Sequence, residues 1–185
     1  MNDEEEIQRL KKGDINGMDA LVLRYQDKAI RTAYLITRDD EMAKDAVQEI
    51  FLRIYQRIRN FDETRPFEPY LLRSVVNTAL NMIEKQHKEV FLSDELSPVD
   101  VEELISKASS TENQVEYAQL KQQIFAALDQ LPPRERAVIV ERYYLGMSEK
   151  EMAGMHEVAP GTVKWLLNVA RQRLRTSIET ENDQL

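Results

Sequence analysis

The 185-residue chain contains no cysteine, which excludes disulfide bonds, thiolate chemistry and cysteine-based zinc sites. Its 5 glycines, 6 prolines and 7% aromatic residues exclude collagen-like and low-complexity classes. The longest apolar run is five residues, 124–128, whereas a membrane span needs about 20. Residues 3–6 are acidic, opposite in sign to the start of a signal peptide, and no apolar segment follows them. We therefore expect a cytoplasmic protein.

Residues that carry enzyme chemistry are equally scarce. The two histidines, His87 and His156, have no second histidine or paired carboxylate at metal-ligand spacing. Ser148 has the position of a helix cap rather than of a nucleophile, and no glycine-rich phosphate loop occurs. We expect no enzyme activity, no metal, no cofactor and no small-molecule substrate.

The net charge of −8 is concentrated in the middle of the chain. Residues 91–116 hold 7 acidic and 1 basic side chains, whereas residues 1–90 hold 17 and 15, and residues 117–185 hold 9 and 9. The apolar pattern also lapses between Phe91 and about Thr111. These changes predict two domains, 1–90 and 113–185, joined by an acidic linker over 91–112.

Apolar residues in the first ninety positions recur at steps of three and four, which is the spacing of amphipathic helices. Three such stripes cover residues 18–36, 43–58 and 72–83, the second behind a start signal at Asp39. Two prolines predict a non-helical loop over residues 60–69. We expect one bundle of three helices.

Helical spacing also dominates the last seventy residues. A stripe over 117–131 ends at two prolines, the second of which opens a helix that runs to Gly146. Ser148 with Glu151 is the signature of a capping box, and Pro160 opens the last helix. Because strand-like alternation is absent, the sequence predicts an all-α fold.

The stretch 148–175 has the spacing of a helix-turn-helix. In this motif the second helix enters the major groove, so its first turns carry small, hydrogen-bonding or basic residues. The residues that fit are Gly161, Thr162 and Lys164, followed by Arg171, Arg173 and Arg175 at positions suited to phosphates. A plain pair of packed helices with solvated arginines is the alternative interpretation.

Two motif sets occur in a fixed order along the chain. The first comprises residues 45–53 (DAVQEIFLR), Phe61-Asp62, Tyr70-Leu71-Leu72-Arg73 and Asn77. The second comprises Leu131-Pro132 with Arg134 and Arg136, Met152-Ala153, Gly161-Thr162-Val163-Lys164, Ala170-Arg171 and Leu174-Arg175. With the acidic linker between them, they resemble regions 2 and 4 of the bacterial extracytoplasmic-function (ECF) sigma factors of the sigma-70 family. The resemblance covers nearly the whole chain.

The resemblance implies promoter recognition and transcription initiation with core RNA polymerase. Contacts to the clamp helices of the largest polymerase subunit would come from Asp45, Gln48, Glu49, Phe51 and Arg53. The melted −10 element would meet Asn60, Phe61, Asp62, Arg65, Tyr70, Arg73 and Asn77. The −35 duplex would meet Pro160, Gly161, Thr162, Lys164, Trp165 and Arg171. The linker would thread toward the polymerase channels or act only as a tether, and an anti-sigma factor is a further implied partner.

Two of these assignments keep a plainer alternative. The charges over residues 45–53 would then be only the solvated face of a helix. Phe61 and Phe67 would either stack on an unpaired base or close the core of the bundle.

Several positions depart from the pattern of the family. Tyr70 replaces the usual tryptophan, Asn81 an aspartate and Trp165 a small polar residue. Arginine is frequent where this chain has Met82, Glu84, Leu166 and Val169, while Ala159 replaces a Ser or Thr cap and Glu157 a turn glycine. Because phosphate contacts supply most nonspecific affinity, we expect feeble binding to free DNA.

Two other functions remain open on these grounds. One is a sigma-like interaction protein with weakened DNA reading, which needs a helper or acts as a regulator. The other is a helix-turn-helix repressor, which would bind duplex DNA without polymerase, as a dimer.

Overall fold

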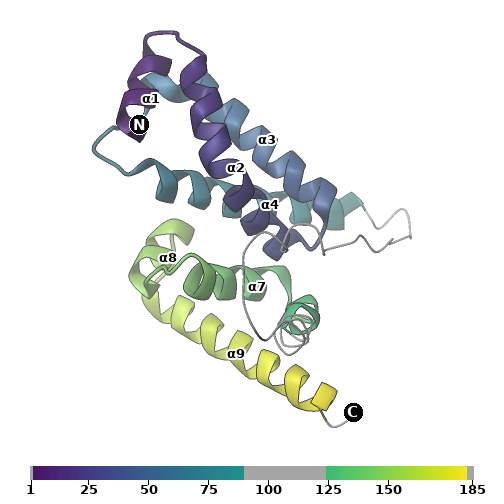
Figure 1. Cartoon of the computed structure of the whole chain (residues 1–185). Helices are drawn as coiled ribbons and strands as arrows, with labels where there is room; N and C mark the ends of the chain where they lie inside the picture. Colours follow the sequence, from purple (N-terminus) through teal and green to yellow (C-terminus); the bar gives the residue numbers. More distant parts are fainter. Residues whose placement is uncertain (1, 90–123, 183–185) are drawn as a thin grey trace, which may run out of the picture. The chain divides into compact units, whose positions relative to one another are not determined.

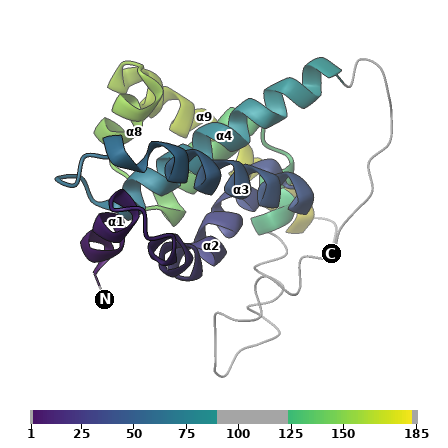
Figure 2. The ribbon, with the colours of Figure 1, turned by 90° about the horizontal axis from the view of Figure 1, so that it is seen from above.

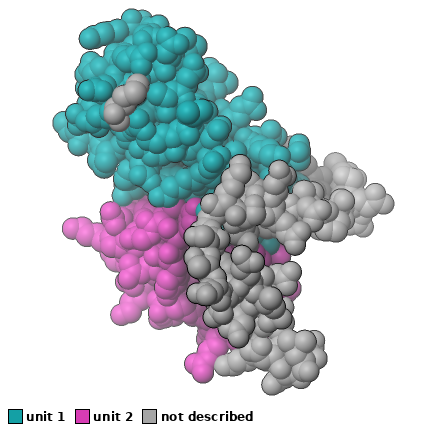
Figure 3. Space-filling model, in the orientation of Figure 1, with its two compact units in different colours: residues 1–94 teal, residues 95–185 magenta. Residues whose placement is uncertain are grey.

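The computed structural model describes residues 2–89 and 124–182, and all regular structure within them is helical. The chain divides into two compact units, residues 1–94 and 95–185, which are coloured separately in Figure 3. The linker predicted over 91–112 and the side chains of His87 and Ile178 lie outside the described part. None of the described helices is long and apolar enough to cross a membrane.

Within residues 2–89 the first unit contains four α-helices and one short 3-10 turn. In chain order they are α1 (Asp3–Lys11), α2 (Asn16–Thr37), α3 (Asp40–Arg57), η1 (Ile58–Asn60) and α4 (Phe67–Glu89). Helices α2, α3 and α4 pack against one another, and α1 packs on α2 and η1 (Figures 1 and 2). The three predicted helices are therefore present, and α1 is an addition.

The core of the first unit consists of the predicted stripes. Buried positions include Leu21, Ala29, Ala33 and Ile36 of α2, Ala43, Ala46, Val47, Ile50 and Ile54 of α3, and Leu72, Val75, Val76, Ala79 and Ile83 of α4. Asp39 caps α3 as predicted, since its Oδ1 accepts a hydrogen bond from the Met42 backbone amide at 2.9 Å.

The predicted loop over residues 60–69 is shorter in the structure. Asn60 ends η1, and α4 already begins at Phe67. Pro69 therefore lies in the first turn of α4. The prediction was wrong there because the first backbone amides of a helix have no intrahelical partner, so a proline costs nothing at that position.

Helix α1 crosses the start of α2 at very short range. A Cβ atom on Gly17 would come within 2.5 Å of the Glu6 carbonyl oxygen, so only glycine permits this approach. Ile7 and Leu10 of α1 are buried in the same contact. Apolar periodicity did not predict this helix, because α1 contributes only two apolar side chains to the core.

The second unit contains a helical segment at 124–129, α7 (Pro133–Ile139), a π-helical turn η4 (Val140–Tyr144), α8 (Glu149–His156) and α9 (Pro160–Asn182). Helix α9 packs against α7 and α8. Pro133 opens α7 and Pro160 opens α9, as the sequence predicts. The predicted single helix to Gly146 is instead an α-helix that widens into a π turn.

The capping box, the glycine before it and the apolar stripe of the last helix have the geometry that the sequence predicts in the second unit. Both hydrogen bonds of the capping box form between Ser148 and Glu151. Gly146 has a φ of 69°, a conformation that glycine adopts without strain. Val163, Leu167 and Ala170 of α9 are buried, which confirms the helical stripe of the last helix up to the described side chains.

Candidate nucleic-acid and polymerase interfaces

An aromatic cluster lies where the loop over residues 61–66 joins α4. The Phe61 ring is 5.0 Å from the Tyr70 ring and 5.9 Å from the Phe67 ring, and Phe67 is 5.6 Å from Tyr25 (centroid distances). Phe67 is only 2% exposed, whereas Tyr70 is 37% exposed and Phe61 half-buried. Phe67 therefore belongs to the core, and the accessible stacking surface consists of Phe61 and Tyr70.

Tyr25 fixes the inner end of this cluster. Its hydroxyl donates a hydrogen bond to Asp3 Oδ2 at 2.6 Å. Burial, together with this bond to a carboxylate, raises the pKa of Tyr25 to about 12. The phenol stays protonated at neutral pH and ties α1 to α2 beneath the aromatic rings.

The loop is shaped by its own side chains. Asp62 Oδ1 accepts hydrogen bonds from the Thr64 backbone amide at 3.1 Å and from the Thr64 hydroxyl at 2.7 Å. These bonds hold the pKa of Asp62 below its usual value. Arg65 is largely exposed and lies 3.4 Å from the Asp62 carboxylate. Asp62 is thus a turn-forming residue, and Asn60 and Arg65 are further exposed polar residues at this loop.

Helix α1 also contacts this loop. Lys11 Nζ donates to the Phe61 carbonyl oxygen at 2.8 Å and lies 2.5 Å from Glu63 Oε1, while Gln8 donates to the other Glu63 oxygen. The Lys11 contact holds the pKa of Glu63 below its usual value. No sequence pattern indicates this arrangement, because the two segments are about fifty positions apart.

The remaining residues predicted for the −10 element extend along α4. Tyr70 and Asn77 are seven residues apart, so they share one face of the helix, with Arg73 at its side. Asn77 is exposed and Arg73 half-buried. Asn81 and Glu84 continue the same face, so the side of α4 beyond Asn77 carries no additional arginine or lysine until Lys85.

Helix α3 presents an exposed face opposite its buried stripe. Asp45, Gln48 and Arg53 are exposed, and Arg53 forms an ion pair with Glu49. Phe51, in contrast, is 8% exposed, so its side chain belongs to the core and not to this face. Among the predicted polymerase contacts, position 51 therefore falls on the buried side of the helix.

The same face carries two apolar residues that the sequence reasoning missed. Leu52 is 55% exposed and Tyr55 is 44% exposed. Together with Asp45 and Gln48 they are spaced three, four and three residues apart, which places all four on one side of α3. Their position outside the apolar stripe was the signal that could have identified them. We call these four residues the α3 face.

The helix-turn-helix of the second unit is formed by α8, a short turn and α9. Glu157 ends α8 with a φ of 54°, the left-handed conformation that explains why glycine is usual there. The first turns of α9 expose most of their side chains, and Val163 between them is buried. Exposed residues are Pro160, Gly161, Thr162, Lys164, Trp165 and Arg171, and Trp165 is 62% exposed.

Two buried carboxylates support this motif from within the second unit. Glu141 in the π turn is fully buried, and its Oε1 lies 2.7 Å from His156 Nε2. Burial raises the pKa of Glu141. His156, which is half-buried, is therefore paired with a buried carboxylate, and is not simply the surface or capping residue that the sequence indicated. No sequence signal links positions 141 and 156.

The second carboxylate pairs with one of the arginines that the sequence places at positions suited to phosphates. Glu135 is buried, and its Oε1 accepts a hydrogen bond from Arg173 at 2.7 Å. Arg173 thus braces α9 against α7. Arg171 is exposed on the same helix and remains suited to a phosphate.

Comparison with known proteins matches each unit separately. Sigma-70 region 2 matches residues 21–89, and Sigma-70 region 4 matches residues 121–174. The ECF RNA polymerase sigma factor SigW of Bacillus subtilis is 28% identical over 176 residues, 93% of this chain and 94% of that protein. The ECF RNA polymerase sigma-E factor of Escherichia coli K12 is 28% identical over 186 residues, 97% of this chain and 95% of that protein.

Solved structures share the fold. The sigma factor RpoE of Bartonella quintana, in complex with the anti-sigma factor NepR, matches with a TM-score of 0.67 and 20% identity, over 87% of this chain and 96% of that one. CnrH in complex with the cytosolic domain of CnrY matches with a TM-score of 0.64 and 20% identity, over 96% and 97%.

The fold and its two candidate interfaces define an all-α protein that combines an aromatic loop in one unit with a helix-turn-helix in the other. With regions 2 and 4 matched in order, and relatives aligned over nearly its full length, the chain belongs to the sigma-70 family, in its extracytoplasmic-function (ECF) group.

Proposed function

We propose that this chain binds core RNA polymerase and directs it to promoters through separate −10 and −35 contacts. The observation that carries the proposal is the presence of one exposed reader in each unit. The first unit offers the Phe61–Tyr70 ring pair, and the second offers the exposed N-terminal turns of α9.

The −10 element is read in single-stranded form by the first unit. Stacking of a base on an aromatic side chain contributes roughly 1–3 kcal/mol and tolerates any base, so specificity needs polar groups beside the rings. Asn60 and Arg65 are exposed next to Phe61, and Arg73 and Asn77 follow Tyr70 on α4. These groups would hold the base edge and the backbone of an unpaired strand.

The −35 element is read as duplex by α9. The first turns of a recognition helix lie in the major groove, where side chains meet base edges and thymine methyl groups. Thr162 and Lys164 supply hydrogen-bond donors, and Trp165 supplies a large apolar surface. Arg171, two turns further on, would contact the phosphate backbone.

Core RNA polymerase binds the α3 face through the clamp helices of its largest subunit. Leu52 and Tyr55 form the apolar centre of this face, and Asp45 and Gln48 form a polar rim around it. An apolar centre with a charged rim is the usual anatomy of a protein interface. The Glu49–Arg53 ion pair lies beside it and sets the charge pattern.

An anti-sigma factor is the second protein partner in this proposal. It would act by covering the α3 face, because an inhibitor that buries Leu52 and Tyr55 excludes the polymerase. An initiation factor of this kind works on the bacterial chromosome, so the proposal places the chain in the cytoplasm.

A sigma-like regulator with little DNA reading is the second candidate. It is favoured by Met82, Glu84, Leu166 and Val169, none of which supplies a positive charge to the DNA-facing elements. Polymerase supplies much nonspecific DNA affinity, and two tethered readers gain from effective concentration. The missing charges therefore predict weak binding to free DNA and do not exclude promoter reading in the complex.

A retention experiment separates these candidates. The full chain is immobilised and offered fragmented genomic DNA from its own bacterium, with and without core polymerase. The proposal predicts that particular fragments are retained only when polymerase is present. Polymerase binding with no enrichment of fragments would favour the regulator. Retention of duplex DNA without polymerase would indicate a repressor and overturn the proposal.

A further inference from the structure

Helix α1 precedes the residues that match Sigma-70 region 2, which begin at residue 21. Its last turn nevertheless reaches the loop assigned above to base capture. Lys11 Nζ is 2.8 Å from the Phe61 carbonyl oxygen and 2.5 Å from Glu63 Oε1.

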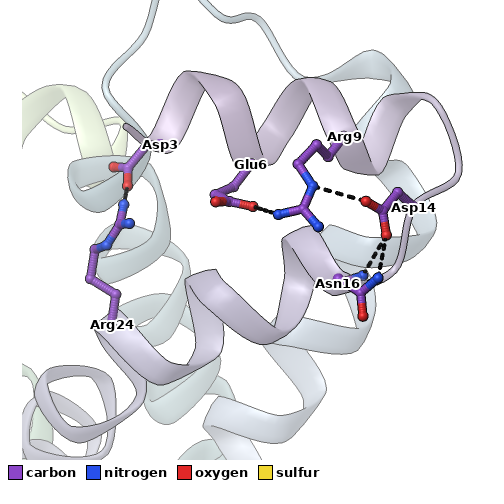
Figure 4. A network of polar contacts seen from close by, with 6 residues as sticks. All are labelled: Asp3, Glu6, Arg9, Asp14, Asn16 and Arg24. Atoms are coloured by element: carbon purple, nitrogen blue, oxygen red, sulfur yellow. Dashed lines mark hydrogen bonds and ion pairs between the residues drawn. The ribbon is translucent and has the colours of Figure 1, made fainter. Parts of the chain in front are cut away.

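The helix that carries Lys11 is held in place by polar contacts at both of its ends. Arg9 donates to Glu6 Oε2 at 2.7 Å and to Asp14 Oδ2 at 2.8 Å, and Asp14 in turn accepts from the Asn16 amide at 3.0 Å (Figure 4). At the other end of α1, Asp3 pairs with Arg24 of α2 in the same figure. Both ends of the short helix are therefore fixed to α2.

We propose that Lys11 is a positioning residue for −10 recognition, which holds the backbone of Phe61 and the Glu63 carboxylate so that the Phe61 ring stays against Tyr70. This inference rests on the proposed function of the loop. The ring is held on one side by Phe67 and Tyr70, and its own backbone is hydrogen-bonded to η1 and to Lys11.

Lys11 also reduces the negative charge of the loop. The loop carries Asp62 and Glu63 side by side, and two carboxylates next to a base pocket repel the phosphates of an incoming strand. The ammonium group of Lys11 neutralises Glu63 at contact distance, and Thr64 already engages Asp62. Loss of Lys11 therefore frees the backbone of the loop and restores a negative charge at the same time.

The test uses the full chain bound to core polymerase and a labelled single-stranded oligonucleotide that carries the −10 element found by start-site mapping. Lys11→Met removes the ammonium group and keeps the aliphatic length. Lys12→Met is the matched control, because the neighbouring Lys12 side chain is exposed. A hydrogen bond from a charged group supports an expected loss of about five- to tenfold in oligonucleotide affinity for Lys11→Met, and less than twofold for Lys12→Met.

The pattern of the loss separates positioning from general electrostatics. Each base of the oligonucleotide is substituted in turn, and the discrimination against the wrong base is measured. Lys11→Met should lose discrimination at the single base that stacks on Phe61, and keep it elsewhere. Lys11→Arg should keep most of the discrimination at that base. Glu63→Gln leaves the hydrogen bond from Lys11 to the Phe61 carbonyl oxygen intact, so it should lose less discrimination than Lys11→Met. Affinity for core polymerase and the melting temperature should match those of Lys12→Met.

Three results would overturn the inference. They are unchanged discrimination in Lys11→Met, an equal loss at every base, and the same loss in Lys12→Met. If the wild-type complex itself binds the oligonucleotide no better than core polymerase alone, the proposed function fails and the inference fails with it. The wild-type control therefore tells the two failures apart.

Discussion

Replacement of Phe61 by leucine tests the aromatic loop most specifically. Leucine keeps an apolar side chain in the half-buried site, but it removes the ring contacts to Phe67 and Tyr70 at 5.9 and 5.0 Å. Each aromatic pair contributes about 0.5–1.5 kcal/mol beyond buried area, and leucine recovers part of the packing. We expect the free energy of unfolding of the first unit to fall by about 1–2 kcal/mol.

The effect on DNA binding should be similar in free energy to this stability loss. A stacked base contributes roughly 1–3 kcal/mol, and Tyr70 remains as a second ring, so the affinity of the polymerase complex for the −10 single strand should fall about tenfold. Fluorescence anisotropy with a labelled oligonucleotide measures this change. Tyr143→Leu is the matched control, because it removes a 62% exposed ring in the other unit.

The result that refutes this reasoning is equally clear. If Phe61→Leu is destabilised as expected but binds the oligonucleotide within twofold of the wild type, the ring only closes the core. The plainer of the two sequence-based alternatives for Phe61 would then hold.

Three further predictions concern other parts of the chain. Lys164→Ala should reduce promoter-dependent transcription and lower the slope of DNA affinity against salt by about one unit, with unchanged affinity for core polymerase. Asp45→Lys should instead weaken binding to core polymerase about tenfold. Equal effects of both changes on the affinity for core polymerase would refute this division of roles. Gly17→Ala should lower the melting temperature by the equivalent of about 1–3 kcal/mol, because its Cβ would meet a carbonyl oxygen at 2.5 Å, and an unchanged value would show that α1 shifts freely. Glu141 has a raised pKa in the folded state, so on acidification it binds its proton before the unfolded chain does, and the free energy of unfolding increases as pH falls through the folded pKa toward 4.5. Between about pH 8 and pH 5, the melting temperature of Glu141→Gln should therefore rise less than that of the wild type. Parallel curves of melting temperature against pH would contradict the role assigned to burial.

The helices that form each core were predictable because their apolar periodicity is strong. Ala43, Ala46, Val47 and Ile50 are buried as their spacing requires, and the Ser148 capping box forms as written in the sequence. These signals are local, since they relate residues three or four positions apart, and local patterns survive folding whenever one face of a helix is covered.

The parts that could not be predicted depend on contacts between distant segments. Helix α1 is short and begins with four acidic residues, and it is held by Gly17 and by ion pairs that have no sequence period. The pairing of Glu141 with His156 depends on a π turn that shifts the register of the helix. The burial of Phe51 could not be predicted for a related reason, because the resemblance assigns a segment to an interface and packing decides which side chains of that segment are exposed.

The most direct test of the central claim is run-off transcription sequencing on fragmented genomic DNA, with core polymerase in the presence and absence of this chain. We expect new start sites that share two upstream elements at a constant spacing. If the chain binds core polymerase in the same reactions and no new starts appear, promoter direction is contradicted.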